Sequence, residues 1–331
     1  MSNIRKTLIT FARKIYCIIT LAKDSHVHPS ELKYNAQQAS EIIFELIESN
    51  KPCMVCRYGA TELTAILNYR AVNNPKISVL DVISGDSIEN WWQDGIFERM
   101  EQWSGFFPSN EDTFKQFSDL MKDDASLVDV LASWRREERQ IQNDLPANVK
   151  RIHLKDLEPF WCEHPWTRAL KGKKVLVVHP FAELIKKQYK RRTHLFKNPN
   201  ILPAFDLDVM PAVQSLGGKV SGFNSWFDAL DCMKTEIDKR DYDICLIGCG
   251  AYGFPLAAHV KRQGKKAIHL GGVLQLLFGI RGNRWDNKNY AVEEWGMPIG
   301  AYSNLINEYW VRPDDNCRPM NANKVEGACY W

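Results

Sequence analysis

Long apolar runs are absent from the 331-residue sequence, and no stretch reaches the roughly 20 residues that a membrane-spanning helix needs. The net positive charge is also low, at +3, and it is spread over the chain rather than gathered into a stripe. A nucleic-acid-binding protein usually carries a concentrated basic surface, so no nucleic-acid partner is expected. Internal repeats and low-complexity segments are lacking as well. A composition of 45% hydrophobic and 25% charged residues is instead typical of a globular protein.

A complete zinc-binding pattern is missing too. The chain has nine cysteines at scattered positions, and Cys53 and Cys56 form one C-x-x-C pair. No second pair follows at the spacing of a zinc site. Free thiols in a reducing compartment such as the cytoplasm are therefore the expected state of these side chains.

The first 23 residues contain no Asp or Glu. Apolar residues recur there at steps of three and four, and five basic residues fall on the other faces. This pattern predicts a basic amphipathic helix, which either lies on an anionic membrane surface or packs against its own domain. A signal peptide is not favoured, because the apolar run 15–22 is short and Lys23 follows it. The apolar positions are Ile4, Leu8, Phe11, Ile15, Ile18 and Ala22; the basic ones are Arg5, Lys6, Arg13, Lys14 and Lys23.

Short apolar segments alternate with amphipathic ones along most of the chain. This alternation predicts an α/β fold, with a Rossmann-like, mostly parallel sheet covered by helices on both faces. In such a sheet ligands bind at the carboxyl ends of the strands. The predicted strands are 51–59, 151–160, 174–179, 242–250 and 265–272, and the predicted helices are 36–50, 60–70, 182–196, 229–240 and 253–264.

Three regions are expected. Residues 1–35 form the amphipathic helix and a polar linker, and residues 36–312 form one α/β domain with a helical insertion around 85–145. Residues 313–331 form a polar tail. Because the tail ends in Tyr330 and Trp331, we expect it to pack back on the domain.

The predicted strand 242–250 ends in a turn that spells G-x-G-x-x-G, with Gly248, Gly250 and Gly253. A dinucleotide site also needs an acidic residue about 20 positions later, for the ribose. The chain has "AIHLGG" there, with His269 and no acid, so NAD is disfavoured. Two interpretations remain open: the turn holds the phosphates of another nucleotide, or its glycines only allow tight packing. In the first case Tyr252 is a candidate to stack on a base or contact a phosphate.

The stretch "CRYGATEL" places Arg57 at a predicted strand end, Gly59 in the turn and Glu62 in the first turn of the next helix. Arginine binds phosphate through two parallel hydrogen bonds, so Arg57 is a candidate for a diphosphate. Glu62 is a candidate metal ligand or catalytic base. The alternative is that Glu62 only caps its helix.

Three further candidates also follow from position. His179 ends the predicted strand 174–179 and suits a base or a phosphate donor, although a structural role is the alternative. Asp86 follows the apolar run 77–83 and Gly85, where a strand end would face the cleft. Arg192 closes a basic run that either contacts a polyanionic donor or is a solvated helix face. The loop 281–285, "RGNRW", is expected to close over the site.

The segment from Arg57 to Leu63 resembles the R-[FY]-G-D-G-E-L motif of the GT-D type glycosyltransferases, bacterial enzymes of surface polysaccharide and glycoprotein assembly with a Rossmann-like sheet. The segment 241–272 is similar to that family's closing strand–turn–helix–strand. The "HPF" after strand 174–179 and the "VEGACYW" end are similar to relatives in polysaccharide gene clusters. The resemblance extends over about residues 36–280.

This resemblance implies a glycosyltransferase that moves a sugar from a nucleotide-sugar donor to a lipid-linked or glycan acceptor. In the family, the D-x-E carboxylates serve a divalent metal and the donor diphosphate. Glu62 matches the second carboxylate, but Ala60 stands where the family has Asp, which puts a Mn²⁺ or Mg²⁺ requirement in doubt. Ala60 favours the alternative of a non-catalytic nucleotide-binding or scaffold protein. The expected location is the cytoplasm, or the inner face of the bacterial inner membrane for a peripherally bound enzyme.

Overall fold

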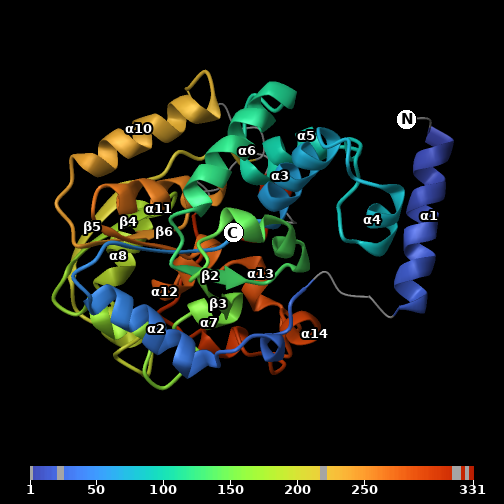
Figure 1. The fold of residues 1–331 in the computed structure, drawn as a ribbon. Helices are drawn as coiled ribbons and strands as arrows, with labels where there is room; N and C mark the ends of the chain where they lie inside the picture. The colour runs from blue at the N-terminus through green and yellow to red at the C-terminus, as the bar shows by residue number, and fades with distance from the viewer. Residues whose placement is uncertain (1–2, 21–25, 217–221, 315–321, 325–327) are drawn as a thin grey trace.

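One parallel sheet of seven strands forms the centre of the molecule, in the order β3-β2-β1-β7-β6-β4-β5 (Figure 1). The computed structural model describes residues 3–20, 26–216, 222–314, 322–324 and 328–331. Every neighbouring pair of strands runs parallel, as the sequence predicted. The strands are β1 Cys53–Cys56, β2 Val130–Ser133, β3 Lys150–His153, β4 Lys174–His179, β5 Asp206–Pro211, β6 Ile244–Ile247 and β7 Lys266–His269.

Helices cover both faces of this sheet, because successive strand residues point to opposite sides and are buried on both. Val55 of β1 belongs to one apolar cluster, for example, and its neighbours Met54 and Cys56 belong to the other. The first cluster includes residues of α2 Ala36–Glu48, α7 Leu154–Leu157, α8 Ala182–Tyr189, α9 Arg192–Leu195, α12 Leu274–Leu277, α13 Asn283–Asp286 and α14 Val292–Trp295. The second includes residues of α3 Ala60–Val72, α5 Ile96–Ser104, α6 Glu111–Ala125, α10 Trp226–Asp238 and α11 Gly253–Arg262.

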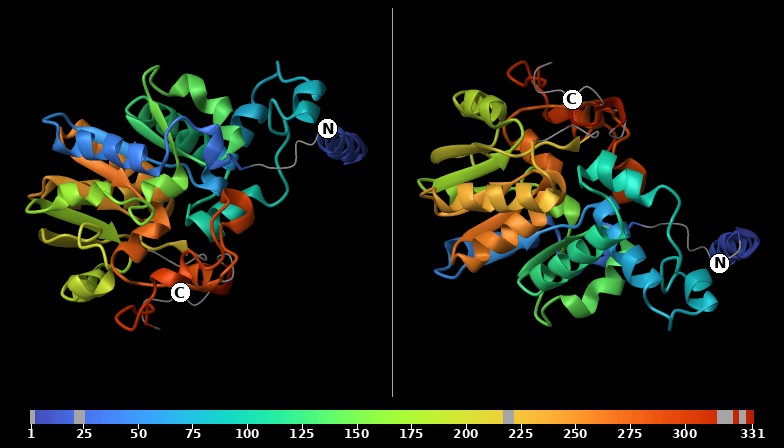
Figure 2. Two further views of the ribbon diagram at one scale, coloured as in Figure 1. Left: turned by 90° about the horizontal axis from the view of Figure 1, so that it is seen from below. Right: turned by 90° about the horizontal axis from the view of Figure 1, so that it is seen from above.

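Two helices lie outside these layers. α1 Asn3–Ile19 stands at one end of the molecule in all views, and α4 Val79–Ser84 separates it from the domain (Figure 1, Figure 2). The predicted N-terminal helix is therefore present; its last predicted residues, Ala22 and Lys23, fall outside the described part of the chain. Within the described residues, no helix is long and apolar enough to cross a membrane.

Several sequence-based assignments need correction. The segment 85–145 is not purely helical, because it contributes β2, and β5 was not predicted. The apolar run 77–83 becomes the helix α4. Its start is fixed by a capping box in which the Ser78 side chain binds the Asp81 amide and Asp81 binds the Ser78 amide. These two hydrogen bonds, each between a side chain and a backbone amide, favour a helix where the apolar residues alone were compatible with a strand.

Candidate functional site

The carboxyl ends of β1, β7, β6 and β4 meet at one edge of the sheet, where a cavity with an empty volume of about 1040 Å³ opens. The chain runs outward from β1 to β2 and β3 on one side, and β7, β6, β4 and β5 lie on the other. This change of direction is where open α/β sheets bind ligands. The lining of this cavity includes seven of the predicted site residues: Arg57, Gly59, Glu62, His179, Gly248, Gly250 and Tyr252.

Arg57 follows β1 and lies half-buried near an aromatic ring and a glycine. Its guanidinium carbon lies 5.3 Å from the centre of the Trp134 ring, a cation–π distance. Gly271 is also close to Arg57, because a Cβ on this glycine would lie 3.6 Å from Arg57 Cδ. The Trp134 indole is itself fixed, since its Nε1 donates to the Tyr58 carbonyl at 3.0 Å. Arg57 thus lies directly after β1, and its side chain lines the cavity.

Glu62 is the third residue of α3, and its carboxylate folds back over the helix start. Gly59 is the N-cap, and a Cβ there would lie 1.8 Å from Glu62 Oε2. The backbone of Gly59 has φ −73°, which any residue adopts, so its missing side chain is needed for space alone. The lack of a side chain at Gly59 therefore leaves the space that the Glu62 carboxylate occupies.

His179 ends β4 and is a neutral hydrogen-bonding group. The Phe181 amide donates to its Nδ1 at 3.0 Å, which places the ring proton on Nε2. Burial lowers the pKa of His179 to about 3. A ring with so low a pKa is a weak base at neutral pH and serves better as a donor to a ligand oxygen.

The glycines after β6 are explained mainly by packing. A Cβ on Gly253 would lie 2.1 Å from the His269 ring, and a Cβ on Gly248 would lie 2.7 Å from the Gly271 carbonyl oxygen and 2.8 Å from His179 Cδ2. Gly250 has φ +60°, the left-handed region that favours glycine. The glycines of the G-x-G-x-x-G motif thus allow close contact between the ends of β4, β6 and β7.

His269 ends β7 and lines the same cavity. Its Nδ1 is 3.3 Å from the Ile247 carbonyl oxygen, to which it donates. Burial, with a smaller effect of the Arg57 charge, lowers the pKa of His269 to about 3. The residue at the position of a ribose-binding acid is therefore a neutral imidazole, which removes the feature that an NAD site requires.

Tyr252 lines the cavity but already has a stacking partner. Its ring lies parallel to Trp226 at 4.8 Å between centres, and its hydroxyl is 3.3 Å from Ser215 Oγ. One face of the ring is therefore used within the core. The hydroxyl is engaged with Ser215 and the side chain is almost completely buried, so stacking on a nucleotide base is not favoured for Tyr252.

The charged lining of this cavity is mainly positive. Arg57 and Arg284 are its two cations, Glu62 is its one carboxylate among the described side chains, and the two histidines are neutral. α3 and α11 also begin here, and the N-cap residues Gly59 and Tyr252 make no capping hydrogen bond with their own side chains. Amide groups at a helix N-terminus and arginine side chains both favour bound anions. The arrangement suits a ligand with negative charge, such as a diphosphate.

Three predicted residues do not line the cavity: Gly253, which lies close to the His269 ring, and Asp86 and Arg192, which lie elsewhere. Asp86 follows α4, is exposed, and contacts Arg139 and Ser84. Arg192 begins α9, where its guanidinium lies 5.4 Å from the Tyr189 ring centre. Neither lines the central cavity, because the run before Asp86 is a helix and the basic helix 182–196 breaks into α8 and α9.

A second cavity adjoins the first and has an empty volume of about 1090 Å³. It shares Arg57, Trp134, Gly272, Arg284 and Tyr330 with the first cavity, so the two arginines stand between them. The rings of Trp285, Tyr290 and Trp295 line the far part. Aromatic lining of this kind binds ligands through their apolar faces.

One acidic group lines the second cavity in its neutral form. Glu158 Oε2 accepts hydrogen bonds from Trp161 Nε1 and Tyr302 Oη, each at 2.8 Å. Burial raises the pKa of Glu158 to about 8, against these hydrogen bonds, which lower it. At neutral pH the side chain is mostly a carboxylic acid, and a carboxylic acid can donate to a hydroxyl group.

The donor set does not fit a divalent metal held by the protein alone. Glu62 is the one described carboxylate of the central cavity, and Ala60 offers no oxygen from its side chain. In the part of the chain that the structure describes, no three His, Cys, Asp or Glu side chains gather as a metal group. A hard cation prefers several oxygen ligands. We therefore derive no step through a metal ion.

Sequence reasoning missed Trp134 and left His269 without a role. Trp134 follows β2, which the sequence did not separate from the helical region around it. The expected loop 281–285 contributes Arg284, which lies on α13 and lines both cavities. The tail also reaches the site: Trp331 is buried, and a Cβ on Gly272 would lie 2.2 Å from the Tyr330 ring. Residues 325–327 of the "VEGACYW" end lie outside the described part.

No protein-family model matches the sequence, and no curated protein matches it. Two solved structures of a domain of unknown function, 1792, are similar to the chain. A selenomethionine-substituted form is 14% identical with a TM-score of 0.38, and the match covers 86% of this chain and 96% of that one. The other is described with the statement that this highly conserved domain "has a distinct glycosyltransferase fold". It is 12% identical with a TM-score of 0.29, covering 92% of this chain and 99% of that one.

Both identities are below 25% and both TM-scores are below 0.5. TM-scores below 0.5 mean that the arrangement of elements differs substantially.

Proposed function

We propose that this protein is a glycosyltransferase that binds a nucleotide-sugar donor in the first cavity and a glycan or lipid-linked acceptor in the second. The observation that carries the proposal is the pair Arg57 and Arg284, which stands between a cavity suited to a diphosphate and an aromatic-lined one. Neutral sugar rings pack their C–H faces on aromatic rings, and phosphates bind arginine. The resemblance at Arg57–Leu63 supports a role in surface polysaccharide or glycoconjugate biosynthesis.

In the proposed reaction, an acceptor hydroxyl oxygen attacks the anomeric carbon of the donor sugar. The bond from that carbon to the phosphate oxygen breaks, and the nucleoside diphosphate leaves with the bonding electron pair. Glu62 takes the proton from the acceptor hydroxyl, as a general base. Arg57 and Arg284 stabilise the charge that grows on the leaving diphosphate, and His179 donates Nε2–H to one of its oxygens.

The proposed donor site is tested by a thermal-shift screen of UDP-, GDP-, CMP- and dTDP-sugars and NADH, each with and without Mn²⁺. We expect one nucleotide-sugar to raise the midpoint of unfolding, since a ligand that binds only the folded state stabilises it by mass action. Arg57→Ala removes a charge-assisted contact of about 1.5–3 kcal/mol, so affinity for that donor should fall about tenfold or more.

Arg192→Ala is the matched control, because it also removes one arginine but lies outside both cavities. It should leave donor affinity unchanged, and the unfolding midpoint of each ligand-free variant shows that it is folded. Equal donor binding by wild type and Arg57→Ala would reject the assigned role of Arg57. A shift with NADH alone would instead favour an oxidoreductase.

A non-catalytic nucleotide-binding or scaffold protein is the second candidate. Ala60 favours it, because the site presents one carboxylate where the resembling family has two. Such a protein would bind a nucleotide through the same arginines without transferring a sugar. Donor binding is common to both candidates, and only turnover separates them.

A further inference from the structure

The helix α1 carries an unusual concentration of exposed apolar side chains. Ten large apolar or aromatic side chains are exposed in the described part of the chain, and seven of them are on α1. Six of the seven share one face, with exposed fractions between 41% and 75%. At 3.6 residues per turn this face spans about 100° of the helix surface. Its residues are Ile4, Leu8, Phe11, Ile15, Ile18 and Ile19.

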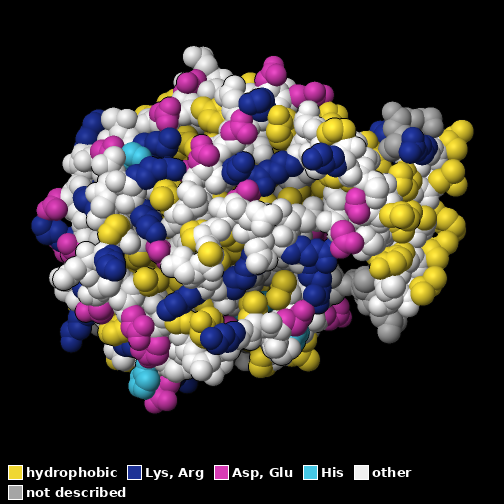
Figure 3. All heavy atoms as spheres, in the orientation of Figure 1, with side chains coloured by type: hydrophobic (Ala, Val, Ile, Leu, Met, Phe, Trp, Pro, Cys, Tyr) yellow, Lys and Arg dark blue, Asp and Glu magenta, His cyan; other side chains and the backbone are white. Residues whose placement is uncertain are grey.

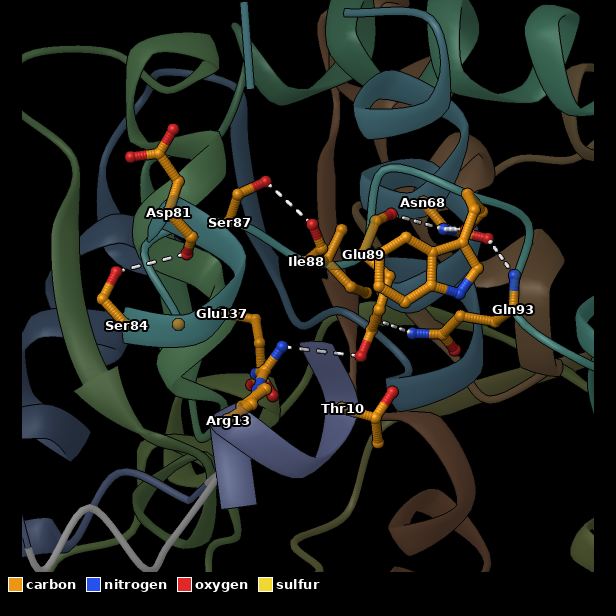
Figure 4. A network of polar contacts seen from close by, with 12 residues as sticks. Thr10, Arg13, Asn68, Asp81, Ser84, Ser87, Ile88, Glu89, Gln93 and Glu137 are labelled. Carbon is orange, nitrogen blue, oxygen red and sulfur yellow. Dashed lines mark hydrogen bonds and ion pairs between the residues drawn. The ribbon is translucent and has the colours of Figure 1, made fainter. Parts of the chain in front are cut away.

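α1 is attached to the protein by its less apolar side. Ile9 is buried, and Arg13 Nη1 lies 3.5 Å from Glu89 Oε1 (Figure 4). Arg13 Nη2 also lies 3.8 Å from the position of a Cβ on Gly85, directly after α4. A helix that served only as a terminal cap would bury its apolar face against the domain. Here that face is directed away, along the outer rim of the molecule (Figure 3).

The charge around the apolar face is of one sign. α1 contains four basic residues and no Asp or Glu. At 3.6 residues per turn, Arg5 and Lys14 lie about 90° from the centre of the apolar face, one on each side. Both side chains are exposed. Positive charge at the rim of an apolar face complements a negatively charged lipid surface.

We propose that the exposed face of α1 docks on a bilayer that contains anionic phospholipids. The helix lies in the interface, with Ile4, Leu8, Phe11, Ile15, Ile18 and Ile19 among the acyl chains and the basic rim at the headgroups. A second copy of the chain fits this face less well, because two such helices would bring basic rims together without an acidic partner.

The docking is independent of the proposed enzymatic activity. If that activity holds, docking brings the two cavities to the membrane where a lipid-linked acceptor resides, and this extension alone rests on the proposed function.

Sedimentation of the full chain with vesicles tests the docking. We expect binding to vesicles of phosphatidylcholine mixed with phosphatidylglycerol, and weaker binding to phosphatidylcholine alone. Leu8→Ser with Phe11→Ser removes two side chains that are 63% and 62% exposed. Partitioning should fall about tenfold or more, since each buries apolar area in the bilayer and not in the protein. Arg5→Glu with Lys14→Glu should abolish the preference for anionic vesicles.

Ile299→Ser is the matched control, because Ile299 is similarly exposed, at 69%, but is not part of α1. It should bind vesicles as wild type does. The inference is wrong if wild type does not sediment with anionic vesicles, or if the Leu8 and Phe11 variant sediments equally well. A vesicle-free dimer that the same variant dissociates would assign the face to a second copy instead. Vesicle binding needs no sugar donor, so its failure is distinct from failure of the transferase proposal.

Discussion

At the carboxyl end of β1, Gly59 leaves the space that the Glu62 carboxylate occupies. Glu62 folds back until its Oε2 occupies the place where a side chain on residue 59 would begin. A glutamate at the third position of a helix commonly contacts the helix start, so a capping role also explains this geometry. The two roles are compatible in one residue, but they predict different results when the carboxylate is displaced.

Gly59→Ala should displace the carboxylate while leaving the fold almost intact. The backbone of residue 59 suits alanine, and the clash involves the end of a flexible side chain. We expect a loss of about 1 kcal/mol or less in unfolding free energy, the usual effect of alanine at an N-cap. Sugar transfer should fall to the level of Glu62→Gln.

A double-mutant cycle provides the control. If Gly59→Ala acts through Glu62, adding it to Glu62→Gln should cause little further loss of transfer. Full activity in Gly59→Ala would show that the position of this carboxylate does not matter for the reaction.

Among the elements, the turn between β6 and α11 shows how packing can require the same glycine pattern as a nucleotide-binding motif. Gly253 leaves room for the ring of His269 on β7. Gly253→Ala should therefore destabilise the protein, by about 1–3 kcal/mol for an overpacked core site, in denaturant unfolding. In a His269→Ala background the ring is gone, and the same substitution should cost clearly less. Equal costs in both backgrounds would mean that the glycine is needed for another reason.

The sequence correctly predicted those elements in which the apolar pattern and the flanking residues indicate the same secondary structure. The strands around Val55, Val177 and Leu246 are buried on both faces and read as apolar runs, followed by glycine or by a helix start. β5 was missed because it is a half-exposed edge strand, with Asp206 and Pro211 at its ends. In the described sheet β5 pairs with β4 alone, so one edge of it stays open and its sequence carries little apolar signal.

The same limits explain which site residues were found. Arg57, Glu62 and His179 directly follow or end predicted strands, and strand ends converge in a parallel sheet. Asp86 was placed wrongly because an apolar run of seven residues fits either a short strand or a helix. Trp134 was missed with the strand that precedes it. Its approach to Arg57 is a contact across two neighbouring strands, which local sequence patterns do not encode.

The whole molecule carries two candidate binding surfaces on one α/β domain. The paired cavities lie at the carboxyl edge of the sheet, and the apolar face of α1 lies at one end of the molecule (Figure 1). The cavities predict a sugar donor with a diphosphate, and the helix predicts a lipid surface. Catalysis at the first of these surfaces would distinguish an enzyme from a scaffold, because both would bind the donor.

We would therefore measure the release of nucleoside diphosphate from the preferred nucleotide-sugar, by wild type and by Glu62→Gln at saturating donor. We expect turnover by wild type, with donor affinity retained in the variant and turnover reduced by about 10²–10⁴, the usual contribution of a general base. Donor binding by wild type with no release of the diphosphate in the presence of glycan or lipid-linked acceptors, or equal turnover by the variant, would contradict it.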